Sequence, residues 1–176
     1  MERAAAEELV RALLDAWNAR DLAAFGALLA SDVYWHDVGM PHPPAIGREA
    51  AVQFAASALT AFPDFMYEIR GPICVSADGR HCVVPWTIRA TQSGPLHPPG
   101  FAPVNRTVCF DGFDSFEFRD GLVARLETRF DPAVPIEQLL GIRVRPAPGS
   151  MAERVLVRLQ RVIAWWIRRR PQTGAR

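Results

Sequence analysis

Apolar and polar residues alternate along residues 105–119, which predicts a β-strand with two different faces. One face carries Val108, Phe110, Asp114, Phe116 and Phe118, and the other carries Thr107, Asp111, Ser115, Glu117 and Arg119. Because successive side chains of a strand point to opposite faces, Asp114 is expected among the apolar residues.

The apolar surroundings expected for Asp114 make it a candidate functional residue. Burying an ionised carboxylate among apolar groups is costly, so such a group usually takes up a proton or acquires a partner. A protonated acid on an apolar wall is typical of a functional site. The strand alone leaves a second interpretation equally open, in which Asp114 lies near a strand end, reaches solvent or accepts backbone hydrogen bonds.

The same periodicities predict a group of helices followed by a group of strands. Helices are predicted over residues 4–18, 22–30, 48–62 and 133–140. Strands are predicted over residues 32–37, 65–75, 81–92, 105–119 and 122–131. Turn formers between strands indicate antiparallel hairpins. This order predicts an α+β domain in which helices cover one face of a curved antiparallel sheet, with a pocket between the two layers.

The charge of the chain changes sign near residue 141. Residues 1–141 hold 11 Arg against 18 Asp and Glu, a net charge of −7, and residues 142–176 hold 9 Arg against one Glu, a net charge of +8. A Pro/Gly-rich stretch at residues 145–150 lies at this boundary. We therefore expect a domain over residues 1–141, followed by a linker and a basic helical tail over residues 142–176.

The tail is predicted to be a basic amphipathic helix over residues 151–170. Its apolar face carries Val155, Leu159, Val162, Ile163 and Trp166, and arginines line another face. We favour packing of this helix on the acidic domain or on a second copy of the chain, and a homodimer is expected. A peripheral contact with an anionic membrane surface is the alternative. Nucleic acid is not expected as a partner, because no recognition residues are interleaved with the arginines.

Other features of the chain indicate a cytoplasmic protein without a cofactor. No apolar run approaches the roughly 20 residues needed to span a bilayer, and the acidic N-terminal segment is not typical of a signal peptide. Three widely spaced cysteines indicate reduced thiols. His36 and His42 are poorly spaced for a metal pair, so no metal site is predicted. Neither a phosphate-binding loop nor a nucleotide fingerprint is present.

Two stretches of the chain carry a family resemblance. Residues 15–37, which include Trp17-Asn-Ala-Arg-Asp21 and end in Tyr34-Trp-His-Asp37, are followed by Gly47-Arg-Glu-Ala50 and later by the stretch at residues 106–121. Together they resemble the SnoaL-like polyketide cyclases of the nuclear transport factor 2-like superfamily, over roughly residues 5–140. The resemblance implies an NTF2-like (cystatin-like) half-cone. Members include cyclases, ketosteroid isomerases, epoxide hydrolases and proteins that only bind ligands or partners.

The resemblance also implies roles for individual residues. Asp37 matches the position where ketosteroid isomerases keep their carboxylate base. Asp114 matches their second aspartate, which stays protonated and donates a hydrogen bond to the developing enolate oxygen. Leu13 stands where those enzymes have the tyrosine of the oxyanion hole, and Gln92 lies near the position of a histidine found in many SnoaL-like cyclases. His97 could replace that histidine if its proline-rich loop folds over the pocket.

Aromatic and imidazole side chains near the two acids are the expected substrate-binding residues. They are Trp17, Trp35, His36, Trp86, His97 and Phe116. For most apolar residues on these strands we favour a role in the core over ligand binding, and Trp35 and Trp86 are the exceptions. Strand alternation places Trp35 on the face of Asp37 and His36 on the opposite face, where a hydrogen-bonded contact between helix and sheet is the alternative to ligand binding.

Two classes of function remain open from the sequence. The first is a small cofactor-free enzyme for acid–base chemistry at a carbonyl, by isomerisation or aldol-type cyclisation of a hydrophobic, polyketide-like molecule. In it, Asp37 removes a proton and Asp114 stabilises the enolate. The second is a non-catalytic module that binds a hydrophobic ligand or assembles with a partner. A pair of acids aimed into one apolar cavity would favour the enzyme, because simple binding does not need them.

Overall fold

The computed structural model describes residues 2–39, 43–97 and 100–169. The chain forms two compact units, Met1–Ile142 and Arg143–Arg176, called here the first and second unit. Within the described residues, no helix combines the length and apolar character needed to cross a membrane.

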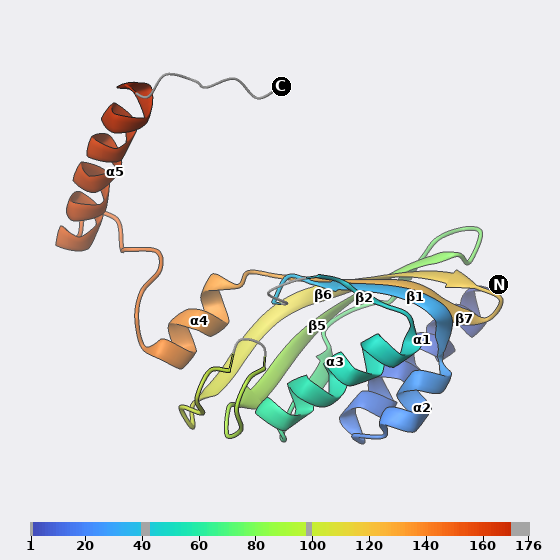
Figure 1. The fold of residues 1–176 in the computed structure, drawn as a ribbon. Helices are drawn as coiled ribbons and strands as arrows, with labels where there is room; N and C mark the ends of the chain where they lie inside the picture. The colour runs from blue at the N-terminus through green and yellow to red at the C-terminus, as the bar shows by residue number, and fades with distance from the viewer. Residues whose placement is uncertain (1, 40–42, 98–99, 170–176) are drawn as a thin grey trace. The chain divides into compact units, whose positions relative to one another are not determined.

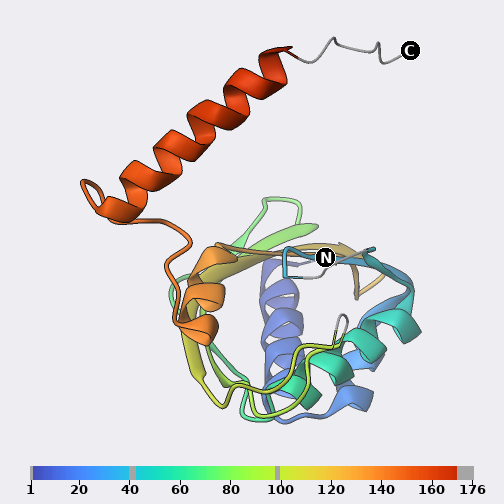
Figure 2. The ribbon, with the colours of Figure 1, turned by 60° about the vertical axis from the view of Figure 1, so that its left-hand side comes forward.

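The first unit combines helices with one sheet, as expected for the α+β class (Figure 1). Its helices are α1 (Arg3–Asn18), α2 (Leu22–Ala27), α3 (Arg48–Ala61) and α4 (Ala133–Leu140). Its strands are β1 (Leu29–Asp37), β2 (Ala45–Ile46), β3 (Met66–Ile69), β4 (Cys74–Val75), β5 (His81–Thr91), β6 (Thr107–Arg119) and β7 (Leu122–Phe130). The strand order is β2-β1-β7-β6-β5-β3, and β4 also pairs with β5. Helices α1, α2 and α3 lie on one face of the curved sheet (Figure 2).

The expectation of a purely antiparallel sheet is wrong at one pairing. β1 runs parallel to β7, with Asp37 opposite Thr128 and Trp35 opposite Leu126. The chain reaches β1 from helix α2 and leaves it towards helix α3, so no hairpin joins β1 to β7 and no turn imposes an antiparallel direction. The sheet is therefore mixed, with antiparallel pairing between its other strands.

Several predicted elements have different bounds in the structure, and two of the differences have a clear physical reason. The strand predicted over residues 65–75 is divided into β3 and β4. β3 and β4 both pair with β5. Between these two pairings lie Pro72 of the predicted strand and Pro85 of β5, which have no N–H group to donate, and this explains the interruption. The helix predicted to reach residue 30 ends at Ala27, because Leu29 already pairs with Val123 of β7.

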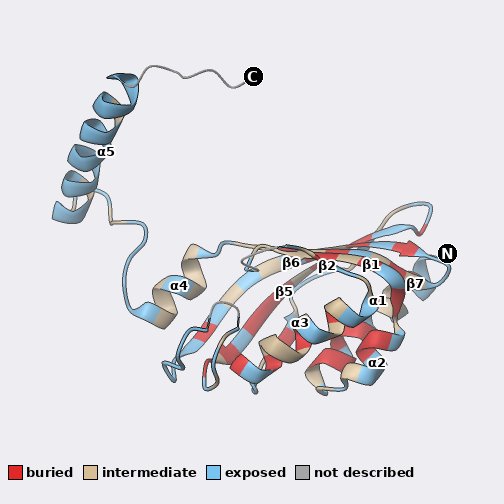
Figure 3. Cartoon of the chain, viewed as in Figure 1, coloured by how far each residue is buried: buried red, intermediate tan, exposed pale blue. Residues whose placement is uncertain are grey.

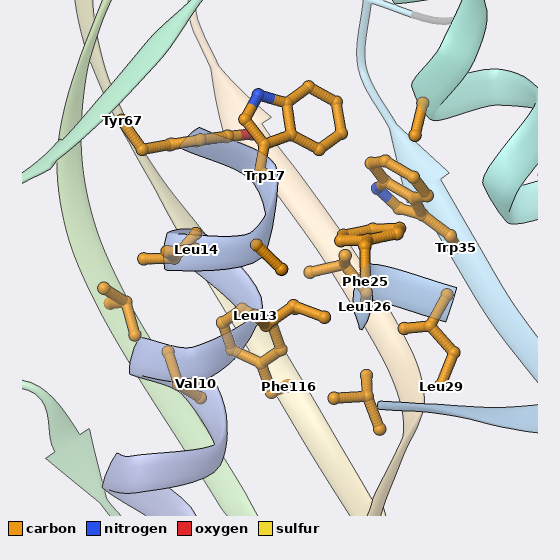
Figure 4. Close-up of a cluster of buried hydrophobic side chains, with 14 of the residues drawn as sticks. Val10, Leu13, Leu14, Trp17, Phe25, Leu29, Trp35, Tyr67, Phe116 and Leu126 are labelled. Carbon is orange, nitrogen blue, oxygen red and sulfur yellow. The ribbon is translucent and has the colours of Figure 1, made fainter. Parts of the chain in front are cut away.

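The core of the first unit lies between the helices and the sheet, where buried residues gather (Figure 3). Trp17, near the end of α1, lies between Tyr67 of β3 and Trp35 of β1 (Figure 4). Its ring centroid lies 5.6 Å from that of Tyr67 and 6.1 Å from that of Trp35, in edge-to-face geometry. Such pairs stabilise the packing beyond the area that they bury, so these contacts hold α1 against both β1 and β3.

Gly112 of β6 provides the space for a buried tryptophan. Trp86 of β5 lies opposite Gly112 and is fully buried. A Cβ added at Gly112 would overlap the six-membered ring of Trp86 and would lie 2.6 Å from the backbone oxygen of Arg129. The missing side chain therefore allows the indole to lie across β6.

The second unit contains one long helix, α5 (Met151–Arg169). Its N-terminus is closed by a reciprocal cap, in which Glu153 N donates to Ser150 Oγ at 3.1 Å and Gly149 N donates to Glu153 Oε2 at 2.5 Å. The predicted last residue of this helix, Arg170, lies outside the described residues. None of the residues of α5 is buried.

We expect Gly112→Ala to lower the free energy of unfolding by about 1–3 kcal/mol, because an overpacked core must shift its side chains or backbone. Gly71→Ala is the matched control, since its added Cβ would meet Pro85 Cγ at an ordinary 3.5 Å. Urea denaturation of both variants measures the difference. Equal stability of the two variants would contradict the role given to Gly112.

Candidate functional site

A cavity of about 930 Å³ lies within the first unit. Its wall is formed by residues of α1, α3 and α4, by the inner face of the sheet, and by the loop that joins β5 to β6. Small-molecule sites usually measure roughly 300–1,000 Å³, so this cavity can hold a ligand of several rings.

The wall of the cavity is mainly apolar and rich in aromatic rings. The aromatic residues are Trp17, Phe54, Phe62, Phe65, Tyr67, Phe101, Phe110 and Phe130. The residues with other polar side chains are Asp37, Gln53, Ser57, Gln92 and His97. Asp37 is the one carboxylate among the described lining residues. A few polar groups in an apolar wall orient a ligand, whereas the wall itself provides most of the contact.

The pairing of the strands brings Asp37 and Asp114 into one row across the sheet. Asp37 of β1 lies opposite Thr128 of β7, and Thr128 lies opposite Asp114 of β6. Thr128 therefore lies between the two aspartates, one strand from each, and neighbouring strands are about 4.8 Å apart. Trp35 Nε1 donates a hydrogen bond to Thr128 Oγ1 at 3.2 Å, which leaves the threonine proton for another acceptor.

Asp114 is buried in the middle of β6, with 2% of its surface exposed. This burial decides against the interpretation in which Asp114 reaches solvent. In the described part of the chain, its Oδ1 atom has no hydrogen-bond partner. Burial raises the pKa of Asp114 to about 7, and the nearby charge of Asp37 also raises it, whereas the polar groups of Thr128 and Trp86 lower it. The acid is therefore largely protonated below neutral pH.

Asp37 is half-buried at the cavity wall, at the end of β1. Its Oδ1 atom accepts a hydrogen bond from Gly39 N at 2.6 Å. Burial raises the pKa of Asp37 to about 6, although the hydrogen bond from Gly39 lowers it. Asp37 is thus mostly ionised at pH 7 and is only weakly solvated, which suits a general base.

Tyr67 is a candidate residue that the sequence reasoning missed. It lines the cavity, and burial raises the pKa of its phenol well above the ordinary value, with further contributions from the charges of Asp114 and Asp37. The hydroxyl therefore remains a neutral hydrogen-bond donor. Asn18 fixes the backbone of Tyr67, because Asn18 Nδ2 donates to Tyr67 O at 3.0 Å and Tyr67 N donates to Asn18 Oδ1 at 2.8 Å.

A signal for Tyr67 was present in the sequence. Strand alternation places it on the same face as the apolar residues Phe65 and Ile69, a pattern that indicates an inward-pointing phenol at this position. The hydroxyl of a buried tyrosine usually has a hydrogen-bond partner in the protein or in a ligand.

Two of the expected substrate-binding residues line the cavity, namely Trp17 and His97. The loop that carries His97 forms part of the cavity wall and is tied to α3, because Ser57 Oγ donates to His97 O at 2.5 Å. The condition for a role of His97, that its loop folds over the pocket, is thus met.

Five other expected site residues do not line the cavity. Trp35, Trp86 and Phe116 are buried in the core, and Asp114 lies in the same deeper layer. Trp86 packs behind the lining rings of Phe110 and Phe130, with centroid distances of 6.1 and 6.3 Å.

His36 lies away from the cavity as well. It is half-buried and stands opposite Glu127, on the face of β1 that points away from Asp37. The expectation that His36 contacts a substrate is therefore not supported by its position. Among the described residues, no group of three or more His, Cys, Asp or Glu side chains could hold a metal ion, and His42 lies outside those residues.

The model of the SnoaL-like domain matches residues 10–126 of the chain. No curated protein matches the chain. Among solved structures, a proposed SnoaL-like polyketide cyclase from Jannaschia sp. CCS1 is similar, with 20% identity and a TM-score of 0.69, over 82% of this chain and 95% of that one.

Two further solved structures share the fold. A proposed polyketide cyclase from Xanthomonas campestris pv. campestris is 23% identical, with a TM-score of 0.66, over 78% of this chain and 98% of that one. A protein with a ketosteroid isomerase-like fold from Catenulispora acidiphila, in complex with trimethylamine, is 16% identical, with a TM-score of 0.63, over 80% of this chain and 98% of that one. At these identities, the likeness shows the fold alone.

The raised pKa of Asp114 predicts a pH-dependent stability. The folded protein keeps the Asp114 proton up to about pH 7, whereas the unfolded chain releases it near pH 4. Because the folded state binds more protons between these values, this group makes the free energy of unfolding fall as pH rises from about 4 to 7. Asp114→Asn keeps a donor of similar size, so we expect the variant to retain the fold. Its free energy of unfolding should lack the contribution of Asp114 to the decrease between about pH 4 and pH 7.

Urea denaturation across this pH range measures the effect. Glu117→Gln is the control, because Glu117 lies on the exposed face of the same strand. If Asp114→Asn and the wild-type protein show the same pH dependence, Asp114 is ionised when buried.

Proposed function

The chain belongs to the SnoaL-like domain family, and we propose that it is a small enzyme for acid–base chemistry at a carbonyl group. Its substrate is a hydrophobic, polyketide-like small molecule, and the reaction is an isomerisation or an aldol-type cyclisation. One observation carries this proposal: Asp37, a carboxyl with a pKa raised to about 6, stands on the wall of an apolar cavity of about 930 Å³. Two similar structures are of proposed polyketide cyclases, which supports the substrate class.

Asp37 is assigned the role of general base. A base works best when its pKa lies near the working pH, and Asp37 combines such a pKa with an ionised form at pH 7. It takes the proton from the carbon next to the substrate carbonyl. The electron pair of that C–H bond forms a C=C bond, and the π pair of the C=O bond moves to the carbonyl oxygen. The resulting enolate then takes this proton back from Asp37 at another carbon, or it attacks a second carbonyl, whose oxygen receives the proton from Asp37.

Tyr67 is assigned the role of donor to the developing enolate oxygen. Tyr67 lines the cavity, and its neutral hydroxyl lies within electrostatic reach of Asp37. A preorganised donor in a dry site stabilises charge that forms only in the transition state. The sequence assigned this contact to Asp114, but Asp114 does not line the cavity.

Asp114 is assigned a positioning role behind the cavity wall. In its protonated form, it adds no second negative charge to the row that contains Asp37. An ionised Asp114 would raise the pKa of Asp37 by repulsion and weaken the cavity as a site for an enolate.

One observation favours a second candidate function, a binding module without turnover. The feature expected of an enzyme was a pair of acids aimed into one cavity, and only Asp37 lines it. In this alternative, the aromatic wall binds a flat hydrophobic ligand and Asp37 orients it.

Asp37→Asn distinguishes the two functions. We expect the wild-type protein to speed the exchange of α-protons of 2-tetralone in D2O, with a rate that rises through about pH 6 as Asp37 ionises. The exchange rate of the variant should be lower than that of the wild-type protein by a factor of at least about 100. Its affinity for the ketone should change by less than about tenfold, or ~1.4 kcal/mol. Proton NMR measures exchange, and quenching of tryptophan fluorescence measures binding.

Asp15→Asn is the control for this experiment, since Asp15 is an exposed carboxylate of α1. If Asp37→Asn loses binding and exchange equally, Asp37 is structural. If the wild-type protein binds the ketone without exchange, the binding module is favoured.

Tyr67→Phe should lower the exchange rate by roughly tenfold to a thousandfold, with little change in ketone affinity, because it removes only the donor to the enolate. Tyr34→Phe is the matched control, since Tyr34 lies on the other face of β1, under the guanidinium of Arg125. Equal rates for the two variants would remove Tyr67 from the reaction.

A further inference from the structure

Helix α5 has a broad apolar face, and most of its residues are coloured as exposed in Figure 3. Successive residues of a helix are about 100° apart, so most of its apolar residues fall in one continuous sector of roughly 160°, and Val157, Ala164 and Trp165 lie outside it. The centre of this sector is formed by Val155, Leu159 and Trp166, whose side chains are 59%, 55% and 50% exposed. A surface of this kind requires an apolar partner.

The other side of α5 is strongly basic. Arg154, Arg158, Arg161 and Arg168 lie together in the opposite sector. Glu153, the single acidic residue of the helix, accepts the hydrogen bond from Gly149 N that closes the N-terminal cap. The polar face of α5 therefore presents positive charge with almost no compensation.

We propose that α5 binds to the surface of an anionic lipid bilayer. In this arrangement, the helix lies parallel to the membrane plane, with its apolar sector at the level of the upper acyl chains. Its arginines reach the lipid phosphates. The helix does not cross the bilayer, since the described part of the chain has no helix apolar enough for that.

The aromatic residues of α5 suit the same location. Trp166 lies within the apolar sector and Trp165 lies among the arginines, where the guanidinium of Arg169 stands 4.0 Å from the centroid of the Trp165 ring. Amphipathic aromatic rings are favoured at the level of the lipid headgroups, where one end is apolar and the other is hydrated.

Pairing of α5 with the α5 of a second copy is less favourable than the bilayer. The second unit holds 9 Arg and one Glu, so two such helices would bring like charges together. A two-stranded seam also needs only a narrow apolar stripe, whereas this sector covers nearly half of the helix. An anionic bilayer can cover the whole width of the apolar sector, and its negative charge attracts the arginines.

The proposal is tested with the full-length protein and sedimented vesicles. One set of vesicles is phosphatidylcholine, and the other contains about one third phosphatidylserine. We expect the protein to bind the phosphatidylserine vesicles at least about tenfold more strongly, and this binding should weaken at high salt. Absence of binding, or equal binding to both vesicles, would overturn the proposal.

Two single substitutions on α5 locate the contact. Leu159→Glu and Gln160→Glu change the net charge equally, but Leu159 is at the centre of the apolar sector and Gln160 is outside it. Leu159→Glu should reduce vesicle binding by more than about tenfold, and Gln160→Glu by less than about threefold. Circular dichroism and thermal unfolding of the first unit should be the same for both variants.

Two outcomes of this comparison would contradict the membrane contact. Equal vesicle binding by the two variants would show that the apolar sector is not used. If the wild-type protein is a dimer that ignores vesicles, and Leu159→Glu makes it a monomer in sedimentation, α5 packs on a second copy instead.

Discussion

The cost of burying charge on the inner face of the sheet is the constraint on which the site depends. Asp37, Thr128 and Asp114 form one row across three strands, and the two carboxyls have different surroundings. Asp114 is enclosed on all sides, so its protonated form is favoured, whereas Asp37 lies at the cavity wall and keeps a backbone hydrogen bond. The same apolar surroundings therefore give one neutral acid and one weakly solvated base.

Much of the fold could be predicted from the sequence, because it depends on local patterns. Alternation along residues 105–119 placed Asp114 on the buried face of β6, and helical periodicity predicted the helix over residues 4–18 that is α1. The α+β class and the SnoaL-like family are confirmed. The parallel pairing of β1 with β7 was not predicted, because it joins segments about ninety residues apart and no local turn encodes it.

The site was harder to predict than the fold, because a strand pattern gives the face of a residue but not its depth. Trp86 and Trp17 both point inwards, yet Trp86 lies behind Phe110 and Phe130 while Trp17 reaches the cavity. Which ring comes first depends on the register of β5, β6 and β7. Tyr67 was missed for a related reason, since the short strand β3 brings it to the cavity through its pairing with Ile88 and through two hydrogen bonds with Asn18.

One buried face of the sheet thus holds two carboxyls with raised and different pKa values. The most direct test is an NMR titration of the aspartate carboxyl carbons in the wild-type protein, with Asp37→Asn and Asp114→Asn to assign the two signals. We expect a midpoint near pH 6 for Asp37 and near pH 7 for Asp114. Midpoints near the ordinary value of about 4 for both residues would contradict this expectation.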